Sequence, residues 1–286
     1  MRKDRITRQL ALLPGYIIIL LWVAFTVSVL SLVFVASFST TKEIFTGKMM
    51  SFETGIHFEN YYKAWTAQNV SLIFGNSLFY AAISCVLLIV IAAPCAYALS
   101  RFKFFANKII QTSFVSAMGV PVIMVVLPLF SIVAGMNLLS NEISNRIVLI
   151  FLYVGINIPY TVIFLLAFFA TIPHSFEEAA AIDGAGPIRT FWTVMFPMAQ
   201  PGVITVTIFN FITVWNEYFL SLIFGNSDKV RPVAVGLYSM INSMRYTGDW
   251  AGMFAAVMIV FLPTFILYIF LSEKIISGVT GGGVKG

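Results

Sequence analysis

Charged residues are scarce in this chain. Asp, Glu, Lys and Arg make up 10% of the 286 residues, against roughly 25% in an average soluble domain. Hydrophobic residues, in contrast, make up 59% of the chain. This composition excludes an ordinary water-soluble domain and predicts a membrane protein.

Cysteine and histidine are also scarce, with two of each. Cys85 and Cys95 lie ten residues apart in one apolar stretch, about 15 Å along a helix, whereas a disulfide needs Cα atoms within about 7 Å. His57 and His174 have no neighbouring Cys or His, so we expect two surface residues and no metal site. No set of nucleophile, base and orienting acid is present. In the glycine-rich tail, residues 278–286, Lys285 is followed by Gly286 and not by the Ser or Thr that a phosphate-binding loop requires. We therefore expect neither catalysis nor a bound cofactor.

Long hydrophobic runs are what the chain has in abundance. A bilayer core takes about 20 apolar residues per helix, and the sequence contains six such windows. They cover residues 13–37, 76–100, 109–134, 147–170, 202–224 and 250–271. The third window contains Pro121 and Pro128, which predict a bent helix. The predicted fold class is all-α, with residues 1–286 forming one polytopic membrane domain of six transmembrane helices.

The distribution of Lys and Arg predicts the orientation. Six spans place both termini on one side, and Lys and Arg near membrane ends favour the cytoplasmic side. With both termini inside, ten Lys and Arg residues lie inside and seven outside, and four of the ten fall within the first eight residues. Both termini and residues 171–201 are therefore predicted to be cytoplasmic. The net charge of +5 is explained by this bias, and we expect no nucleic-acid partner.

Residues 171–201 form the longest charged, turn-rich interruption on the predicted cytoplasmic side. Ser175 and Glu178 have the spacing of a capping box, which predicts a helix that begins at Phe176. Gly184 can adopt the left-handed conformation that ends such a helix. The segment is thus expected to begin with one short helix.

A second short helix is expected to follow. Pro187 suits a first helical position, and residues 188–196 continue the helix up to Pro197 and Pro201. Two interpretations are open from the residues alone: an amphipathic connector on the membrane surface, or a compact knob on which a partner packs. Small side chains between the helices favour close approach of another backbone: Ala179, Ala180, Ala181, Gly184, Ala185 and Gly186.

The residues of this segment closely resemble the EAA loop of ATP-binding-cassette (ABC) importer permeases. The resemblance lies in Glu178-Ala-Ala-Ala-Ile-Asp-Gly-Ala-Gly186, Phe191, Val194 and Phe196-Pro-Met-Ala-Gln-Pro-Gly202. Further matches occur in order, at Asn76-Ser-Leu78, Ala96-Tyr-Ala-Leu-Ser-Arg-Phe102, Trp215-Asn-Glu217 and the tail. From about residue 60 onward, the chain is similar to the carbohydrate-importer branch, and in particular to the second permease subunit of maltose-type importers.

This resemblance implies a type I ABC importer permease fold in a bacterial-type inner membrane. It implies that residues 171–201 form a cytoplasmic two-helix coupling loop, which docks in a cleft of an ATPase subunit. The implied partners are a second similar permease, two ATP-binding subunits that carry ATP and Mg, an extracytoplasmic solute-binding protein and the lipid bilayer. Residues 225–249 are implied to contact the binding protein. The residues implied to couple to the ATPase are Glu177, Glu178, Ala179, Ala180, Ala181, Asp183, Gly184, Ala185 and Gly186.

The fifth window carries polar residues at helical spacing. Thr207, Asn210, Thr213, Glu217 and Ser221 recur every three or four residues and would share one helix face. Glu217 is the one carboxylate in an apolar window, and an intramembrane acid suggests function. The face either lines a translocation path or bonds to neighbouring helices, and the nearby aromatic residues either meet a sugar or anchor the helix at the interface. Candidate pathway residues are Asn210, Thr213, Trp215, Asn216, Glu217 and Tyr218.

The function expected from these features is that of a non-enzymatic permease subunit. It would move a sugar or oligosaccharide inward, with ATP hydrolysed on separate subunits. One alternative is an ion-coupled secondary transporter that uses Glu217, although no intramembrane basic or His partner accompanies this acid. A second alternative is a membrane scaffold without transport activity.

Overall fold

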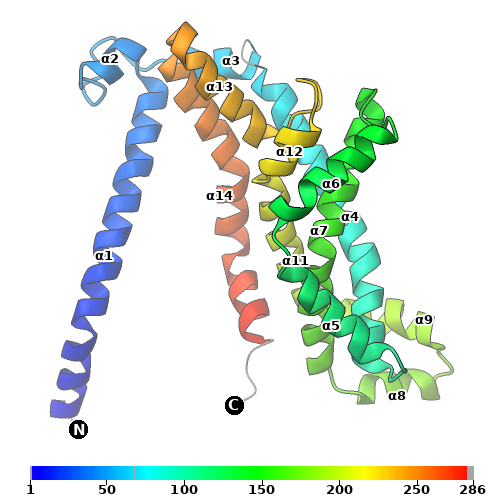
Figure 1. Ribbon diagram of the computed structural model, residues 1–286. Helices are drawn as coiled ribbons and strands as arrows, with labels where there is room; N and C mark the ends of the chain where they lie inside the picture. The colour runs from blue at the N-terminus through cyan, green and yellow to red at the C-terminus, as the bar shows by residue number, and fades with distance from the viewer. Residues whose placement is uncertain (1, 67–68, 282–286) are drawn as a thin grey trace. The chain divides into compact units, whose positions relative to one another are not determined.

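The computed structural model describes the backbone of residues 2–66 and 69–281 (Figure 1). Within these ranges the regular structure is helical throughout and no strand occurs, which confirms the predicted all-α class. Four of the described helices are long and apolar enough to cross a bilayer, and two bent helix pairs raise the number to as many as six. The chain divides into two compact units, Met1–Val70 with Ser239–Phe261 and Ser71–Tyr238 with Leu262–Gly286.

The first unit begins with the long helix α1 (Arg2–Phe38), whose apolar part, Leu12–Phe38, agrees with the first predicted span. Two short helices follow, α2 (Thr41–Phe45) and α3 (Glu59–Thr66). The first turns of α14 (Trp250–Gly281) complete the unit, where the Trp250 ring contacts Phe45 in α2 at 5.8 Å between centroids. The segment after α1 is therefore folded.

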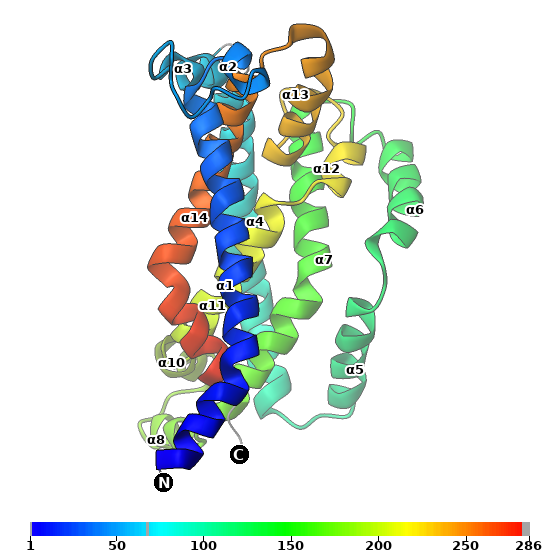
Figure 2. The same ribbon diagram turned by 90° about the vertical axis from the view of Figure 1, so that its left-hand side faces the viewer.

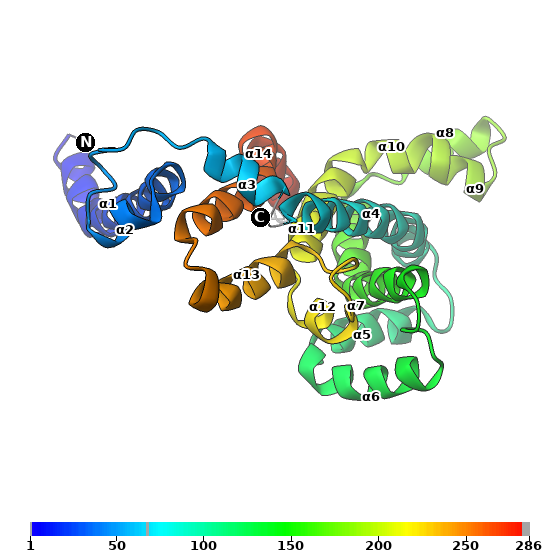
Figure 3. The same cartoon turned by 90° about the horizontal axis from the view of Figure 1, so that it is seen from above.

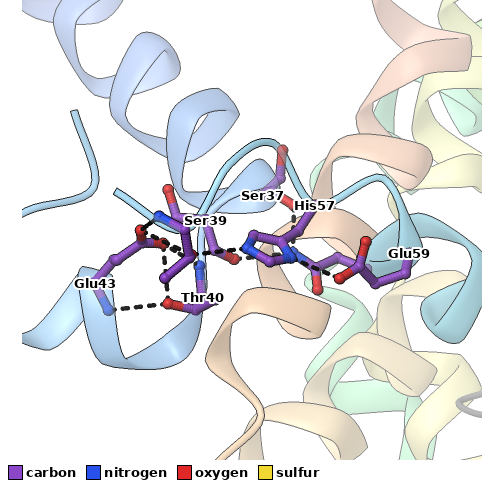
Figure 4. A network of polar contacts seen from close by, with 8 residues as sticks. Ser37, Ser39, Thr40, Glu43, His57 and Glu59 are labelled. Atoms are coloured by element: carbon purple, nitrogen blue, oxygen red, sulfur yellow. Dashed lines mark hydrogen bonds and ion pairs between the residues drawn. The ribbon is translucent and has the colours of Figure 1, made fainter. Parts of the chain in front are cut away.

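A buried carboxylate organises this folded segment (Figure 4). The Glu43 side chain is buried and accepts hydrogen bonds from the backbone N–H groups of Thr40 and Thr54, at 2.8 and 2.9 Å. Both threonine hydroxyls also donate to it. The backbone bond from Thr40, followed by that from Thr54, lowers the pKa of Glu43 to about 2. The charged carboxylate thus joins the first turn of α2 to a loop eleven residues further on.

Neighbouring side chains extend this network towards α3. Asn60 is buried and donates from Nδ2 to the carbonyl oxygens of Ser37 and Ser39, at 3.0 and 2.9 Å. His57 lies between Thr54 and Glu59, with Nδ1 2.6 Å from the Glu59 carboxylate. His57 is half-buried and belongs to this polar network, with 21% of its side chain exposed.

The second unit is built around two long helices, α4 (Val70–Arg101) and α7 (Glu142–Thr171), which run side by side (Figures 1 and 3). They correspond to the second and fourth predicted spans. Their side chains share two hydrophobic clusters, one around Tyr80 and Tyr153 and the other around Tyr97 and Phe169. The ring centroids of these two pairs are 5.9 and 5.6 Å apart. Helices α4 and α7 are thus packed together near both of their ends.

The third predicted span is divided into α5 (Asn107–Met118) and α6 (Val122–Gly135), which meet at 97° (Figure 2). The predicted bend is confirmed, and its position is Gly119 to Pro121. Pro121 has no backbone N–H and its ring would collide with the preceding helical turn, so it caps α6 and does not continue α5. Pro128, in contrast, lies within α6.

The fifth window is also divided, and the prediction of one helix over residues 202–224 was wrong. Helix α11 (Gln200–Trp215) ends before Asn216, and α12 (Phe219–Phe224) begins after Tyr218. The predicted loop over residues 225–249 contains a further helix, α13 (Val233–Thr247). Helix α14 continues beyond the predicted sixth span as far as Gly281, and the last five residues of the glycine-rich tail lie outside the described residues.

The pKa of Glu43 generates a prediction for the segment between α1 and α3. Because this pKa is lower in the folded chain than its ordinary value of 4.5, the charged carboxylate stabilises the segment above that value. The stabilisation should be lost as the pH falls from about 4.5 towards 2. The protection of residues 39–60 against hydrogen exchange, corrected for the pH dependence of intrinsic exchange, should therefore fall over this range in the native chain, and Glu43→Gln should lower it already at pH 7.

Glu53→Gln is the matched control for this experiment. Glu53 forms an exposed ion pair with Lys48 at 2.9 Å, and exposed pairs contribute little to stability. Equal exchange in the two variants at pH 7 would contradict the structural role of Glu43.

Candidate functional site

The predicted coupling loop, residues 171–201, begins with helix α8 (Ser175–Ile182). The predicted capping box was wrong. The N-cap residue is His174, no side chain caps the helix, and the Glu178 N–H donates to the His174 carbonyl oxygen at 3.1 Å. Ser175 lies within the helix because the residue before it already has a helical backbone, with φ −63° and ψ −24°.

The end of α8 agrees with the prediction for Gly184. This residue has φ +77°, which L side chains rarely adopt. The Gly184 N–H donates to the Ala181 carbonyl at 3.0 Å, and the Ala185 N–H donates to the Ala180 carbonyl at 2.9 Å. These two bonds constitute a Schellman motif, and they turn the chain towards the second helix.

The second helix begins at Pro187, as predicted, but it has three parts. These are α9 (Pro187–Thr190), a π-helical turn (Phe191–Met195) and α10 (Phe196–Met198). The helix extends through Pro197 to Met198, and the chain bends by 74° at Ala199 into α11. Figure 3 shows α8, α9 and α10 projecting away from the α4 and α7 pair. The predicted two-helix loop is therefore present, and its second helix contains a π-helical turn.

Arg101, at the end of α4, holds the beginning of the loop. Its Nη2 donates to the Ile172 carbonyl at 2.6 Å, and its Nε lies 3.3 Å from the Glu177 carboxylate. His174 completes this arrangement, with Nε2 3.3 Å from Arg101 and Nδ1 3.1 Å from Glu177. The Arg101 and Glu177 side chains are largely buried. We call this group the Arg101 clamp, and it shows that Glu177 already has partners within the chain.

Aromatic rings join the base of the loop to both long helices. Phe191, in the π-helical turn, lies 5.2 Å from the Tyr97 ring of α4 and 6.2 Å from the Phe169 ring of α7. All three rings are buried, and aromatic pairs of this kind contribute about 0.5–1.5 kcal/mol beyond their area. Sequence reasoning missed Arg101, Tyr97 and Phe169, although the segment from Ala96 to Phe102 was noted as a family match.

The far side of the loop exposes apolar side chains. Ile182 and Ile188 are 87% and 78% exposed, and the small residues Ala179, Ala181 and Gly186 beside them are also exposed. Exposed apolar groups gathered next to small residues mark an interaction surface. Among the predicted coupling residues, Ala180 is buried under the loop. Sequence reasoning missed Ile182 and Ile188, because nothing in the sequence showed which way they point.

The polar face predicted from Thr207 to Ser221 is interrupted, since α11 stops at Trp215. Asn210 is buried and donates from Nδ2 to Thr161 Oγ1 in α7 at 3.0 Å. The Trp215 side chain is 1% exposed and stacks on Phe211 at 5.5 Å between ring centroids. Thr213 and Asn216 are exposed, and each hydrogen-bonds a carbonyl of its own helix. Asn210 could line a translocation path or bond to a neighbouring helix, and the structure contains the second arrangement.

Glu217 lies in the break between α11 and α12 and caps the second helix. Its Oε1 accepts from the Leu220 N–H at 2.7 Å, and its Oε2 accepts from the Ser221 N–H at 3.0 Å and the Ser221 hydroxyl at 2.7 Å. The Ser221 hydroxyl also lies 2.6 Å from the Tyr153 hydroxyl of α7. Tyr218, beside it, contacts the Tyr238 ring at 5.3 Å. The carboxylate replaces the intrahelical partners that the first amides of α12 lack.

These features define a class of protein: a helical membrane subunit that carries a tethered loop with an exposed apolar surface. Residues 86–273 match the family described as binding-protein-dependent transport system inner membrane component, and the chain belongs to this family. It is therefore a multi-pass inner-membrane permease of an ABC importer, has no enzymatic activity of its own, and acts together with an ATPase and a binding protein.

Individual proteins similar to the chain agree with this assignment. The diacetylchitobiose uptake system permease protein NgcG of Streptomyces coelicolor is 33% identical over 94% of this chain and 87% of that protein. The probable starch degradation products transport system permease protein AmyC of Thermoanaerobacterium thermosulfurigenes is 29% identical over the whole of both chains. None of the comparisons favours a secondary transporter or a scaffold.

A solved structure shows the same fold. It is a chain of a bacterial ABC transporter involved in the import of the acidic polysaccharide alginate, which matches 96% of this chain and 98% of that chain. The TM-score is 0.76 at 24% sequence identity. The predicted importer permease fold is thereby confirmed.

The Arg101 clamp generates a prediction about the loop. Arg101→Gln removes one partner of a largely buried ion pair, which costs about 3 kcal/mol or more. Hydrogen exchange of residues 173–185 should accelerate strongly in the assembled transporter. Lys103→Gln is the control, since Lys103 is exposed two residues further along. Native exchange rates in Arg101→Gln would show that the clamp does not hold the loop.

The two roles considered for Glu217 predict different mutant behaviour. Glu217→Gln keeps one acceptor oxygen for the amides of α12, whereas Glu217→Ala removes both and should cost roughly 1 kcal/mol as a lost cap. If Glu217 is a cap, transport should be retained largely in the Gln variant and reduced in the Ala variant. A complete loss of transport in Glu217→Gln, with normal assembly, would instead support an ionisable pathway residue.

Proposed function

We propose that this chain is the permease subunit that carries a sugar or an oligosaccharide into the cytoplasm. Its relatives support this substrate class, because their names specify diacetylchitobiose, starch degradation products and melibiose, raffinose and stachyose. The observation that carries the coupling assignment is the exposed apolar surface around Ile182 and Ile188 on a loop that is firmly attached to α4 and α7.

The proposed assembly contains a second, similar permease, two ATP-binding subunits and one extracytoplasmic binding protein. ATP and Mg bind to the ATPase subunits, and this chain binds no cofactor. Both termini and the coupling loop lie in the cytoplasm, as the distribution of Lys and Arg indicates. Within the second unit, the coupling loop and residues 225–232 attach to opposite ends of α4 and α7. This placement supports their assignment to opposite sides of the membrane.

The coupling loop is proposed to work as a lever. Ile182 and Ile188 would enter a cleft of the ATPase subunit, where Gly184, Gly186 and the exposed alanines permit close approach. When the ATPase pair closes, the loop moves, and the Arg101 clamp transmits this movement to α4. The aromatic contacts of Phe191 transmit it to α7 as well. The permease pair then opens outward to receive substrate.

The substrate path is proposed to pass the break between α11 and α12. Irregular backbone within a membrane is tolerated where it lies in protein or lines a hydrophilic cavity, and many transporters bind substrate at such broken helices. Thr213 and Asn216 are exposed near this break. Asn210 and Trp215 are buried by their neighbours within this chain. In this proposal they pack α11 beside the path and do not contact the substrate.

Replacing the exposed isoleucines tests the coupling surface. The double variant Ile182→Asp/Ile188→Asp should leave this chain folded, since both side chains project into solvent. Burial of one such side chain contributes about 1.5–3 kcal/mol, so co-purification of the ATPase should fall at least about tenfold. ATP hydrolysis stimulated by a sugar-loaded binding protein should fall with it.

For co-purification of the ATPase, the control is Ile143→Asp, because Ile143 is 73% exposed at the opposite end of α7. Normal ATPase binding in the double variant would refute the assignment of the docking surface. The native transporter also tests the substrate class: if no saccharide in a panel of disaccharides and longer oligosaccharides stimulates hydrolysis through the binding protein, the sugar assignment is wrong.

A further inference from the structure

Residues 225–232 connect α12 and α13 at the end of the second unit opposite to the coupling loop. The segment is rich in turn residues and has no regular helix, yet the Gly225 backbone and the Val230 side chain are buried. Its order therefore cannot come from its own secondary structure. Side chains from α4 and α7 supply it.

Asn76, near the beginning of α4, is the centre of these contacts. Its Nδ2 donates to the carbonyl oxygens of Lys229 and Arg231, both at 2.9 Å. Its Oδ1 accepts from Nη1 of Arg146 in α7 at 2.7 Å, and Nη2 of the same guanidinium donates to the Lys229 carbonyl at 2.6 Å. The Asn76 side chain is buried, and both ends of its amide are hydrogen-bonded.

Two neighbours of Asn76 complete the arrangement. The Tyr80 hydroxyl donates to the Val230 carbonyl at 2.8 Å, and the Ser77 hydroxyl accepts from the Val233 N–H at 2.8 Å. Three consecutive carbonyl groups, those of residues 229–231, thus accept hydrogen bonds from side chains of α4 or α7. We call this group of Asn76, Ser77, Tyr80 and Arg146 the Asn76 clamp.

The opposite side of the segment faces solvent and carries charge. The Asp228 side chain is 88% exposed and pairs with Arg231, while Lys229 pairs with Glu142 of α7 at 2.8 Å. Beside these charges lies an open pocket of about 630 Å³, which is lined by Leu139, Ser140, Asn141, Glu142, Ile143, Asn226 and Ser227. A rigid polar surface with a shallow pocket suits a hydrated contact with a water-soluble protein.

We propose that Asn76 and Arg146 are positioning residues, which hold residues 225–232 in the conformation that contacts the extracytoplasmic binding protein. This inference rests on the proposed function. A loop that is already ordered loses less conformational entropy on binding than a flexible one. Polar side chains suit this task better than apolar ones, because their directional bonds select one backbone conformation.

The clamp also has a place in the transport cycle. Residues 225–232 are bound to one end of α4 and α7, and the Arg101 clamp and Phe191 bind the coupling loop to the other end of the same helices. Docking of the binding protein and movement of the ATPase therefore act on one pair of packed helices. Loss of the Asn76 clamp would leave residues 225–232 without a fixed conformation before docking, while the coupling loop stays in place.

The experiment uses the assembled transporter in nanodiscs, with ATP hydrolysis titrated by the substrate-loaded binding protein. Asn76→Leu keeps a similar side-chain volume and removes all three hydrogen bonds of the amide. The concentration of binding protein at half-maximal stimulation should rise at least about tenfold, since the segment must be ordered on binding. Basal and maximal hydrolysis should stay near the native values. Hydrogen exchange of residues 225–236 should accelerate, whereas that of residues 173–185 should not.

Asn157→Leu is the control, because the Asn157 amide donates within α7 itself, to the Tyr153 carbonyl at 2.8 Å. Arg146→Gln should also raise the half-maximal concentration of binding protein. Arg146→Lys should raise it less, since the lysine retains a charged donor. An unchanged half-maximal concentration in Asn76→Leu, whether or not exchange accelerates, would overturn the proposal.

The exposed variant Asp228→Ala tests the surface if Asn76→Leu fails to assemble. It should also raise the half-maximal concentration, and a native value would count against the proposal. If the native transporter shows no stimulation by the binding protein, the proposed function fails and the inference fails with it. If the native transporter responds and the variants behave identically, the inference alone fails.

Discussion

The need to pair every backbone N–H and C=O group inside a bilayer governs this structure. Long helices meet this need within themselves, so α4 and α7 form the frame of the second unit. Breaks are possible only where another group replaces the helical partners. At Pro121 no N–H requires a partner, and at Glu217 the carboxylate accepts from the amides that begin α12. The positions of the helix breaks are therefore fixed by particular residues, Pro121 and Glu217.

The functional parts are attached to the frame in the same way at both ends. At one end, Arg101 binds a carbonyl of the chain leaving α7 and a carboxylate of α8. At the other, Asn76 and Arg146 bind carbonyls of the segment that leads into α13. Each clamp uses an amide or a guanidinium, whose several donors fit a fixed geometry. In the proposed mechanism, a movement imposed on either end would reach α4 and α7 directly, so an ATPase on one side could control access on the other.

Much of this architecture can be predicted from the sequence. The apolar windows predict the positions of the long helices, Pro121 the bend in the third span, and Gly184 and Pro187 the elbow of the coupling loop. The prediction failed where a side chain had more than one possible partner. The Ser175 and Glu178 pair matched a capping box, but Glu177 binds Arg101 and the helix begins earlier. Glu217 and its neighbours matched a continuous helical face, but α11 ends at Trp215 and the Glu217 carboxylate caps the next helix.

The sequence by itself determined the membrane class, the family, the approximate spans and the turns at Gly184 and Pro187. These follow from hydrophobicity, from left-handed backbone freedom and from a missing N–H, which are properties of single residues and close neighbours. Only the tertiary structure decided the partners of Glu177, Glu217 and Asn76, and the outward direction of Ile182 and Ile188. Asn76 and Lys229 are 153 residues apart in the chain. Contacts over such separations depend on which helices pack together, and a local pattern of residues does not predict this packing.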